Sequence, residues 1–216
     1  MVYVAWFADL TKGDIALAGG KGANLGEMAH ADLPVPPGFV VTSQAYQHFL
    51  WKNRARRELG RLLRSIRVDD QKQLERQSNR IRDMIMECRM PAVIENTIRE
   101  NYRKLLDQGS RAVFVAVRSS ATAEDLSGAS FAGQQDTYLN VCAEDLISCV
   151  QRCWSSLFTS RAIFYREKQG FDHNRVSMAV IVQKMINAEK AGVMFTVNPV
   201  TCEEGQIIIE AVWGLG

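Results

Sequence analysis

The middle of the chain follows a helical pattern of hydrophobic and polar positions. Residues 52–108 repeat apolar side chains every three or four positions, with breaks near residues 68–70 and 89–91. An aspartate at the first break, Asp69 or Asp70, is suited to cap a helix. The pattern therefore predicts several consecutive helices between two regions of different character.

The two ends of the chain carry short apolar runs that are typical of strands. Further helices are expected after Thr42 or Ser43 and at residues 144–158 and 160–168. Runs rich in Val, Ile and Phe predict strands near residues 1–6, 39–41, 113–117, 137–139, 177–182, 193–197 and 206–212. Strands that follow helices in this order, with antiparallel character, indicate an α+β fold.

The composition fits a globular protein that does not enter a membrane. The 216 residues can form one sizeable core or two small ones, and 47% hydrophobic with 23% charged residues is ordinary. No apolar run approaches the roughly 20 residues that span a bilayer, and the N-terminus lacks the basic and apolar regions of a signal peptide. We therefore expect a cytoplasmic protein without a membrane partner.

Charge and cysteine usage add two expectations. The net charge is only +2, but basic residues gather between Lys52 and Arg111, with no aromatic residue between Lys52 and Asn101. This favours solvated helical faces over a nucleic-acid surface. The five cysteines include no C-x-x-C pair, so we expect buried, reduced thiols.

The first segment with candidate chemistry is residues 19–27, with the sequence GGKGANLGE. Its glycines let a backbone approach a ligand closely, and residues 23–30 are expected to form a short helix. Lys21 would then lie just before that helix, where backbone N–H groups and the helix dipole favour an anion. A glycine-rich turn with a solvated lysine is the alternative, because the spacing is not that of a P-loop.

The second segment runs from residue 117 to residue 139 and begins VRSSATAED. The apolar run before it places Arg118 at the expected end of a strand, followed by serine and threonine hydroxyls and exposed amides. An arginine at the end of a buried strand is costly unless it finds an anion. The alternative is an arginine paired with Glu124 or Asp125, carboxylates that could instead hold a metal.

Taken together, these segments resemble the ATP-binding domain of the phosphoenolpyruvate synthases (pyruvate, water dikinases), which pyruvate phosphate dikinase and the rifampicin phosphotransferases share. The resemblance rests on GGKGANLGEM, PVPPGFVVT, AVRSSATAED and SFAGQQDTYLN in series. Later pieces agree, namely SLFTSRA, VQKM, AGVMFT and EAVWGLG, so the resemblance covers essentially the whole chain.

The resemblance implies an ATP-grasp fold with ATP held between two α+β subdomains. We expect the first at residues 1–182 and the start of the second at residues 183–216. Lys21 and Arg118 are expected to act on the ATP phosphates, and Gly133 and Thr137 to lie in the loop that covers them. A hinge formed by Gln183, Lys184 and Met185 is expected to bind adenine.

The resemblance also implies parts that this chain does not contain. Relatives carry Mg²⁺ ligands beyond the motif that ends at Gly216, so the metal ligands are expected downstream. A phosphohistidine domain and a pyruvate domain are also expected elsewhere, because His30, His48 and His173 lack the acceptor's sequence context.

The chain is therefore expected to be the ATP-binding part of a pyruvate, water dikinase and to be inactive by itself. The alternatives are the same domain of a rifampicin phosphotransferase or of pyruvate phosphate dikinase, and a non-catalytic nucleotide-binding module. The apolar strand near the end of the chain predicts an uncovered sheet edge, so the chain can form homo-oligomers.

Overall fold

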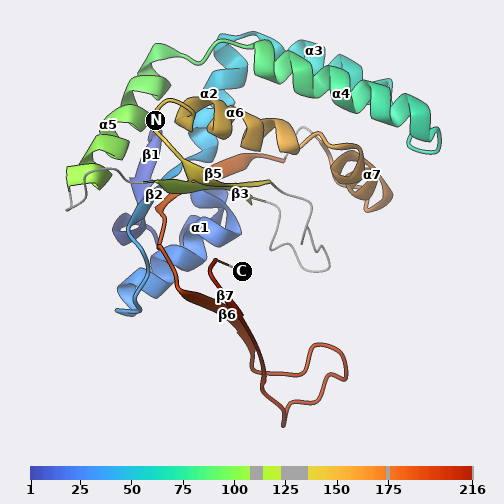
Figure 1. The fold of residues 1–216 in the computed structure, drawn as a ribbon. Helices are drawn as coiled ribbons and strands as arrows, with labels where there is room; N and C mark the ends of the chain where they lie inside the picture. Colours follow the sequence, from blue (N-terminus) through green and yellow to red (C-terminus); the bar gives the residue numbers. More distant parts are fainter. Residues whose placement is uncertain (108–113, 123–135, 174–175, 216) are drawn as a thin grey trace. The chain divides into compact units, whose positions relative to one another are not determined.

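The computed structural model describes the chain except for residues 108–113, 123–135, 174–175 and 216 (Figure 1). The chain divides into two compact units, Met1–Met185 and Ile186–Gly216. The boundary expected after residue 182 lies inside the last strand of the first unit, which ends at Lys184.

The first unit contains an antiparallel sheet of five strands. Their order across the sheet is β1 (Val4–Trp6), β2 (Gly38–Val41), β5 (Met178–Lys184), β3 (Val115–Ala121) and β4 (Thr137–Val141). The long strand β5 is central, because it pairs with β2 on one side and β3 on the other. The expected mixture of helices and antiparallel strands is confirmed.

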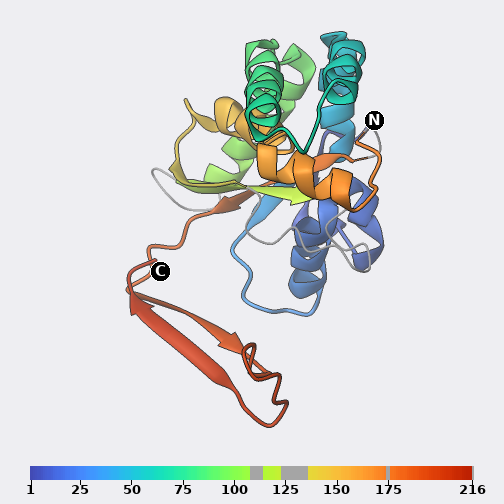
Figure 2. The same ribbon diagram turned by 90° about the vertical axis from the view of Figure 1, so that its right-hand side faces the viewer.

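Helices cover the two faces of this sheet unequally (Figures 1 and 2). One face packs against α1 (Ile15–His30), and Ala179 and Ile181 of β5 belong to that core. The alternate residues Val180 and Val182 belong to a larger core on the other face. The helices that contribute to this larger core are α2 (Ser43–Lys52), α3 (Ala55–Arg64), α4 (Gln71–Glu87), α5 (Ala92–Asp107), α6 (Leu146–Ser156) and α7 (Ser160–Lys168).

Side-chain caps fix where several of these helices begin. The Thr42 hydroxyl accepts a hydrogen bond from the Ala45 N–H at 3.3 Å, and the Asp70 carboxylate accepts one from the Gln73 N–H at 3.0 Å. Such caps satisfy N–H groups that have no partner inside the helix. The caps expected at these two positions are therefore confirmed.

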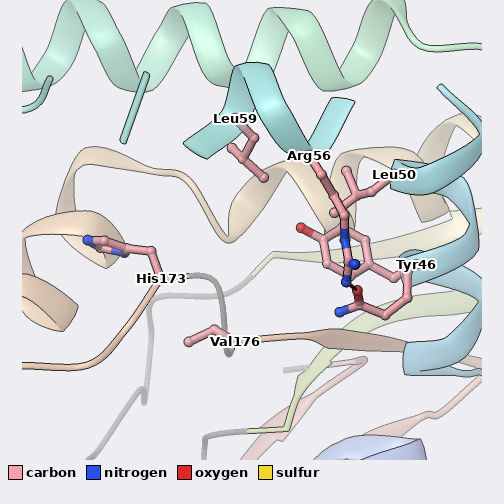
Figure 3. A pocket seen from close by; sticks show the side chains of 7 residues that line it. Tyr46, Leu50, Arg56, Leu59, His173 and Val176 are labelled. Carbon is pink, nitrogen blue, oxygen red and sulfur yellow. Dashed lines mark hydrogen bonds between the residues drawn. The ribbon is translucent and has the colours of Figure 1, made fainter. Parts of the chain in front are cut away.

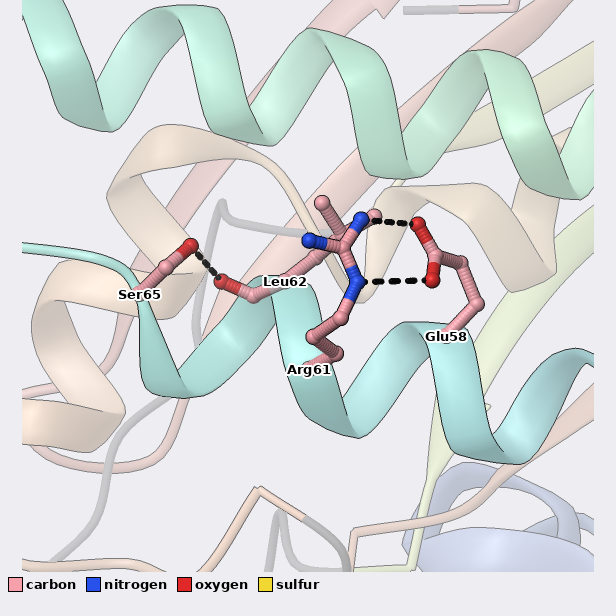
Figure 4. Close-up of polar contacts among 4 residues, drawn as sticks. All are labelled: Glu58, Arg61, Leu62 and Ser65. Atoms are coloured by element: carbon pink, nitrogen blue, oxygen red, sulfur yellow. Dashed lines mark hydrogen bonds and ion pairs between the residues drawn. The ribbon is translucent and has the colours of Figure 1, made fainter.

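The basic segment of the chain forms amphipathic helices, as α3 illustrates (Figure 4). Leu62 of this helix is buried, whereas Arg61 is exposed and forms a bidentate ion pair with the partly exposed Glu58, with an Nε–Oε2 distance of 2.8 Å. At the end of the helix, the Ser65 hydroxyl donates to the Leu62 carbonyl oxygen at 2.7 Å. The arginines here lie on a solvated helical face, as the charge pattern predicts.

The second unit contains a two-stranded antiparallel sheet of β6 (Lys190–Phe195) and β7 (Ile208–Trp213). Both strands differ by a few residues from the expected 193–197 and 206–212. The register pairs Lys190 with Trp213, and the Lys190 ammonium lies 4.7 Å from the centre of that indole ring. A cation over an aromatic face is a favourable arrangement that helps to hold this register.

Two further expectations concern the burial of the cysteines and the absence of a membrane-spanning helix. All five cysteines are free, and Cys149 and Cys153 are buried as expected, but Cys202 is exposed in the connection between β6 and β7. The expectation of buried thiols is therefore wrong for Cys202 and holds only in part for Cys88 and Cys142, which are partly buried. Among the described residues, no helix has the length and apolar character needed to cross a membrane.

Candidate functional site

The glycine-rich segment forms a kink inside α1 rather than a loop before a helix. Gly19 interrupts the helix with φ 69° and ψ 169°, a backbone conformation that essentially only glycine adopts. A Cβ atom at this position would lie 2.3 Å from the backbone oxygen of Ser120. Gly19 therefore serves both the kink and a close approach between α1 and β3.

The side chain of Ser120 holds the kink open. Its buried hydroxyl accepts a hydrogen bond from the Gly22 N–H at 3.1 Å and donates one to the Ala18 carbonyl oxygen at 2.8 Å. In an uninterrupted helix the Gly22 N–H would donate to the Ala18 carbonyl directly. The hydroxyl is thus inserted into the helical hydrogen-bond ladder, which is a recognised cause of sharp kinks.

The kink corrects the expected position of Lys21. Residues 20–30 form a helical segment of their own after Gly19, so Lys21 lies in its first turn and not before it. Gly26, which was expected to let a ligand approach, faces Leu10 instead, because a Cβ there would lie 2.3 Å from the Leu10 carbonyl oxygen. Close packing within the protein, more than contact with a ligand, explains that glycine.

The second segment also differs from its expected form. Strand β3 extends to Ala121, so Arg118 lies in the middle of the strand and not at its end. Ser119 is buried, and its N–H and hydroxyl donate to the Asp136 carbonyl oxygen at 3.2 and 3.1 Å. The Thr122 hydroxyl donates to the Ser177 carbonyl oxygen at 3.1 Å. These groups join strands together, so the expectation that they offer free amides and hydroxyls to a ligand is wrong.

Strand register places the expected site residues on one face of the sheet. Arg118 lies directly opposite Ile181 of β5 and Thr137 of β4. Side chains directly opposite each other share a face, and Ile181 belongs to the core around α1. Arg118 and Thr137 therefore lie on the α1 face, as does Gln183, two residues beyond Ile181 on the same strand.

The two segments meet through this arrangement. The Gly22–Ser120 hydrogen bond joins residues that are 98 positions apart in the chain. Lys21 directly precedes Gly22 in the chain. Arg118 lies two residues before Ser120, about 7 Å along the strand and on the same face of the sheet. Within the part of the chain that the structure describes, no carboxylate forms an ion pair with Arg118.

The expected hinge uses several of its hydrogen-bonding groups within the fold. The Lys184 N–H donates to the Pro37 carbonyl oxygen at 3.0 Å, and the Met185 N–H donates to the Phe114 carbonyl oxygen at 2.9 Å. The side-chain nitrogen of Gln183 donates to the Pro36 carbonyl oxygen at 3.1 Å. Any contact of this segment with an adenine base must therefore use hydrogen-bonding groups that are not already used within the fold.

Several residues of the second segment cannot be placed. Gly133, Glu124 and Asp125 lie outside the described residues. The described residues contain no group of three or more His, Cys, Asp or Glu side chains that could hold a metal ion. The residues that the structure places together, a helix start with Lys21 in its first turn and an arginine on the facing strand, suit the charge of phosphate groups and not that of a metal ion.

Comparison with known proteins identifies the family. Residues 15–216 match the family described as "Pyruvate phosphate dikinase, AMP/ATP-binding domain". The whole chain is 54% identical to a probable phosphoenolpyruvate synthase of Methanocaldococcus jannaschii and spans 18% of that protein. It is 53% identical to the probable phosphoenolpyruvate synthase of Methanothermobacter thermautotrophicus and spans 31% of it.

A third relative carries the same name without qualification. Over 99% of the chain the identity is 47% to the phosphoenolpyruvate synthase of Pyrococcus furiosus, of which the chain spans 30%. The chain therefore corresponds to less than a third of the length of each of these relatives. On the extent of the family match, this chain belongs to the family of pyruvate phosphate dikinase AMP/ATP-binding domains.

Proposed function

We propose that this chain binds ATP as the nucleotide-binding part of a phosphoenolpyruvate synthase. In the proposed reaction, ATP, pyruvate and water give AMP, phosphoenolpyruvate and phosphate by way of a phosphohistidine. The family match supports binding of AMP or ATP. The names of the relatives favour a phosphoenolpyruvate synthase over the rifampicin phosphotransferase and pyruvate phosphate dikinase alternatives.

The observation that carries the proposal is the insertion of the Ser120 hydroxyl between Ala18 and Gly22. It creates a new helix start inside α1 and fixes this start against the strand that bears Arg118. Helix starts attract anions through their N–H groups and dipole. An arginine can add a bidentate contact to phosphate oxygens, and Lys21 a compact positive charge. Phosphoryl transfer depends mainly on such placement of charge.

None of the three histidines is proposed as the phosphoryl acceptor, because each ring has a contact within the fold. The ring of His30 contacts the Gly26 carbonyl oxygen at 2.9 Å, and that of His48 contacts the Tyr3 hydroxyl at 3.0 Å. His173 is held by Arg166 and Glu167. Because each ring is engaged in the fold, we assign the phosphohistidine and the pyruvate site to other parts of the enzyme. Without them, this chain by itself should form no phosphoenolpyruvate.

The finer features of the site follow from the same proposal. We propose an ATP-grasp arrangement, with the nucleotide phosphates on the α1 face and the base near residues 183–185. Thr137 and Gly133 would belong to the segment that covers the phosphates. Mg²⁺ would enter with the nucleotide to offset phosphate charge, and we assign no metal ligand to the described residues.

Calorimetric titration of ATP with Mg²⁺ tests the proposal. Arg118→Ala should weaken ATP binding about tenfold or more, because a charge-assisted hydrogen bond contributes about 1.5–3 kcal/mol. Arg57→Ala removes the same charge from the exposed face of α3 and is the matched control. Equal affinities of the two variants, or no binding of ATP to the unaltered chain, would contradict the assignment.

A second assay tests the proposed division of labour. The chain is incubated with ATP, Mg²⁺ and pyruvate, and AMP is measured. We expect binding without pyruvate-dependent formation of AMP. Turnover that depends on pyruvate would show that the acceptor groups lie within these 216 residues.

A further inference from the structure

A second polar hollow lies on the sheet face opposite α1. It has a volume of about 250 Å³, and Figure 3 shows the side chains that line it. Tyr46 and Arg56 contribute polar groups, and Leu50, Leu59 and Val176 contribute apolar walls. His173 also lines the hollow, with its ring turned away from Tyr46 and Arg56 (Figure 3). Tyr46, Leu50, Leu59 and Val176 all belong to the larger core, so the sheet separates this hollow from the proposed phosphate site.

A buried arginine lies behind one wall of the hollow. Arg166 of α7 is only 1% exposed. Its Nε donates to Nδ1 of His173 at 3.0 Å, and another guanidinium nitrogen donates to the Leu157 carbonyl oxygen at 2.5 Å. Among the described residues no carboxylate forms an ion pair with it. Burial lowers the pKa of Arg166 to about 10, so it remains a cation at neutral pH.

A buried cation of this kind is costly unless an anion compensates it. His173 cannot do so, because its Nδ1 accepts a hydrogen bond from Arg166 and the ring must therefore be neutral. The other ring nitrogen, Nε2, lies 3.1 Å from the exposed carboxylate of Glu167. Burial, together with the charge of Arg166, lowers the pKa of His173, and Glu167 opposes this effect only in part.

A second guanidinium stands at the rim of the hollow. Arg56 is exposed and donates to the side-chain oxygen of Gln47, which holds it beside Tyr46 (Figure 3). Burial raises the pKa of the Tyr46 hydroxyl, against the opposing influence of Arg166 and then Arg56. The Tyr46 hydroxyl therefore stays protonated and can donate a hydrogen bond, and both arginines affect its pKa. Among the described residues, none that lines the hollow carries a negative charge.

We propose that this hollow binds a phosphate group, with Arg56 and the Tyr46 hydroxyl as direct ligands and Arg166 as a positioning charge behind His173. The described lining of the hollow offers donors and no carboxylate, which suits an oxyanion better than a metal cation. Two guanidiniums match phosphate better than they match a singly charged carboxylate. The proposal is independent of ATP binding, since its residues lie on the other face of the sheet.

Proton NMR of the histidine rings tests the proposal with inorganic phosphate as the probe. The chain contains only three histidines, so each ring can be assigned by substitution. Phosphate is added at constant pH and constant ionic strength, with chloride replaced in proportion. We expect a saturable shift of the His173 signals, with His30 on α1 unchanged. Acetate serves as the carboxylate arm and should produce a shift at least tenfold weaker at the same concentration.

Two variants of neighbouring arginines provide the matched control. Arg56→Gln should weaken phosphate binding at least fivefold, whereas Arg57→Gln removes the same charge from the same helix and should leave it unchanged. The proposal is overturned if phosphate produces no saturable His173 shift, if the two variants behave alike, or if acetate binds as tightly as phosphate. A phosphate-induced shift of His30 alone would place the anion on the α1 face and also overturn it.

Discussion

Replacing Ser120 with alanine removes the hydroxyl that holds the kink in α1. The variant leaves two buried backbone groups without their partner, the Gly22 N–H and the Ala18 carbonyl. Leaving a buried polar group unsatisfied costs about 1–3 kcal/mol. We therefore expect the free energy of unfolding to fall by about 2–4 kcal/mol, a large share of the stability of a domain.

Ser119→Ala is the matched control on the same strand. The Ser119 hydroxyl donates to the Asp136 carbonyl, but this carbonyl also accepts from the Ser119 N–H and keeps that bond. Loss of the Ser119 hydroxyl should lower the free energy of unfolding by about 1 kcal/mol. Urea unfolding followed by circular dichroism measures both variants, with the slope checked for two-state behaviour. If the two variants differ by less than about 0.5 kcal/mol, the inserted hydroxyl does not hold the kink.

Three further changes test other parts of the fold. Gly19→Ala combines a left-handed backbone with a contact of 2.3 Å to Ser120, so thermal unfolding should show a loss of at least about 3 kcal/mol. Asp70→Ala removes the cap of α4 and should cost about 1 kcal/mol in urea unfolding. The lowered pKa of His173 means that stability is lost as pH falls from 6.5, the value of an unperturbed imidazole, through the folded-state pKa. His173→Asn should reduce this loss when urea midpoints at pH 7.5 and 5 are compared, and an unchanged pH dependence would count against it.

The sequence alone predicts most of the helices and strands, because these depend on local signals. Apolar periodicity and capping residues lie within a few positions of the elements that they define, as the Asp70 cap of α4 illustrates. The resemblance to a family follows from short motifs in the right order. Periodicity, capping residues and short motifs can all be recognised without knowing which segments meet in space.

The arrangement around Gly19 could not be predicted in the same way. The role of Ser120 depends on hydrogen bonds to residues 98 and 102 positions away. From the sequence, a serine beside an arginine therefore looks like a ligand group, although its hydroxyl is used inside the protein. The apolar run stops at Val117 and so predicts Arg118 at a strand end, whereas pairing with β5 continues the strand to Ala121. The hollow behind α2 and α3 also unites residues from distant segments, and no local pattern indicates it.

The most direct test of the central claim is where the phosphates of bound ATP lie. Manganese can replace magnesium on ATP and broadens the NMR signals of nearby nuclei. We predict that Mn²⁺–ATP broadens the amide signals of residues 20–22 and 118 first, while those of Tyr46 and Leu59 on the opposite face of the sheet remain sharp. Broadening centred on Tyr46 and Leu59, with the amides of residues 20–22 and 118 unaffected, would contradict the proposed site.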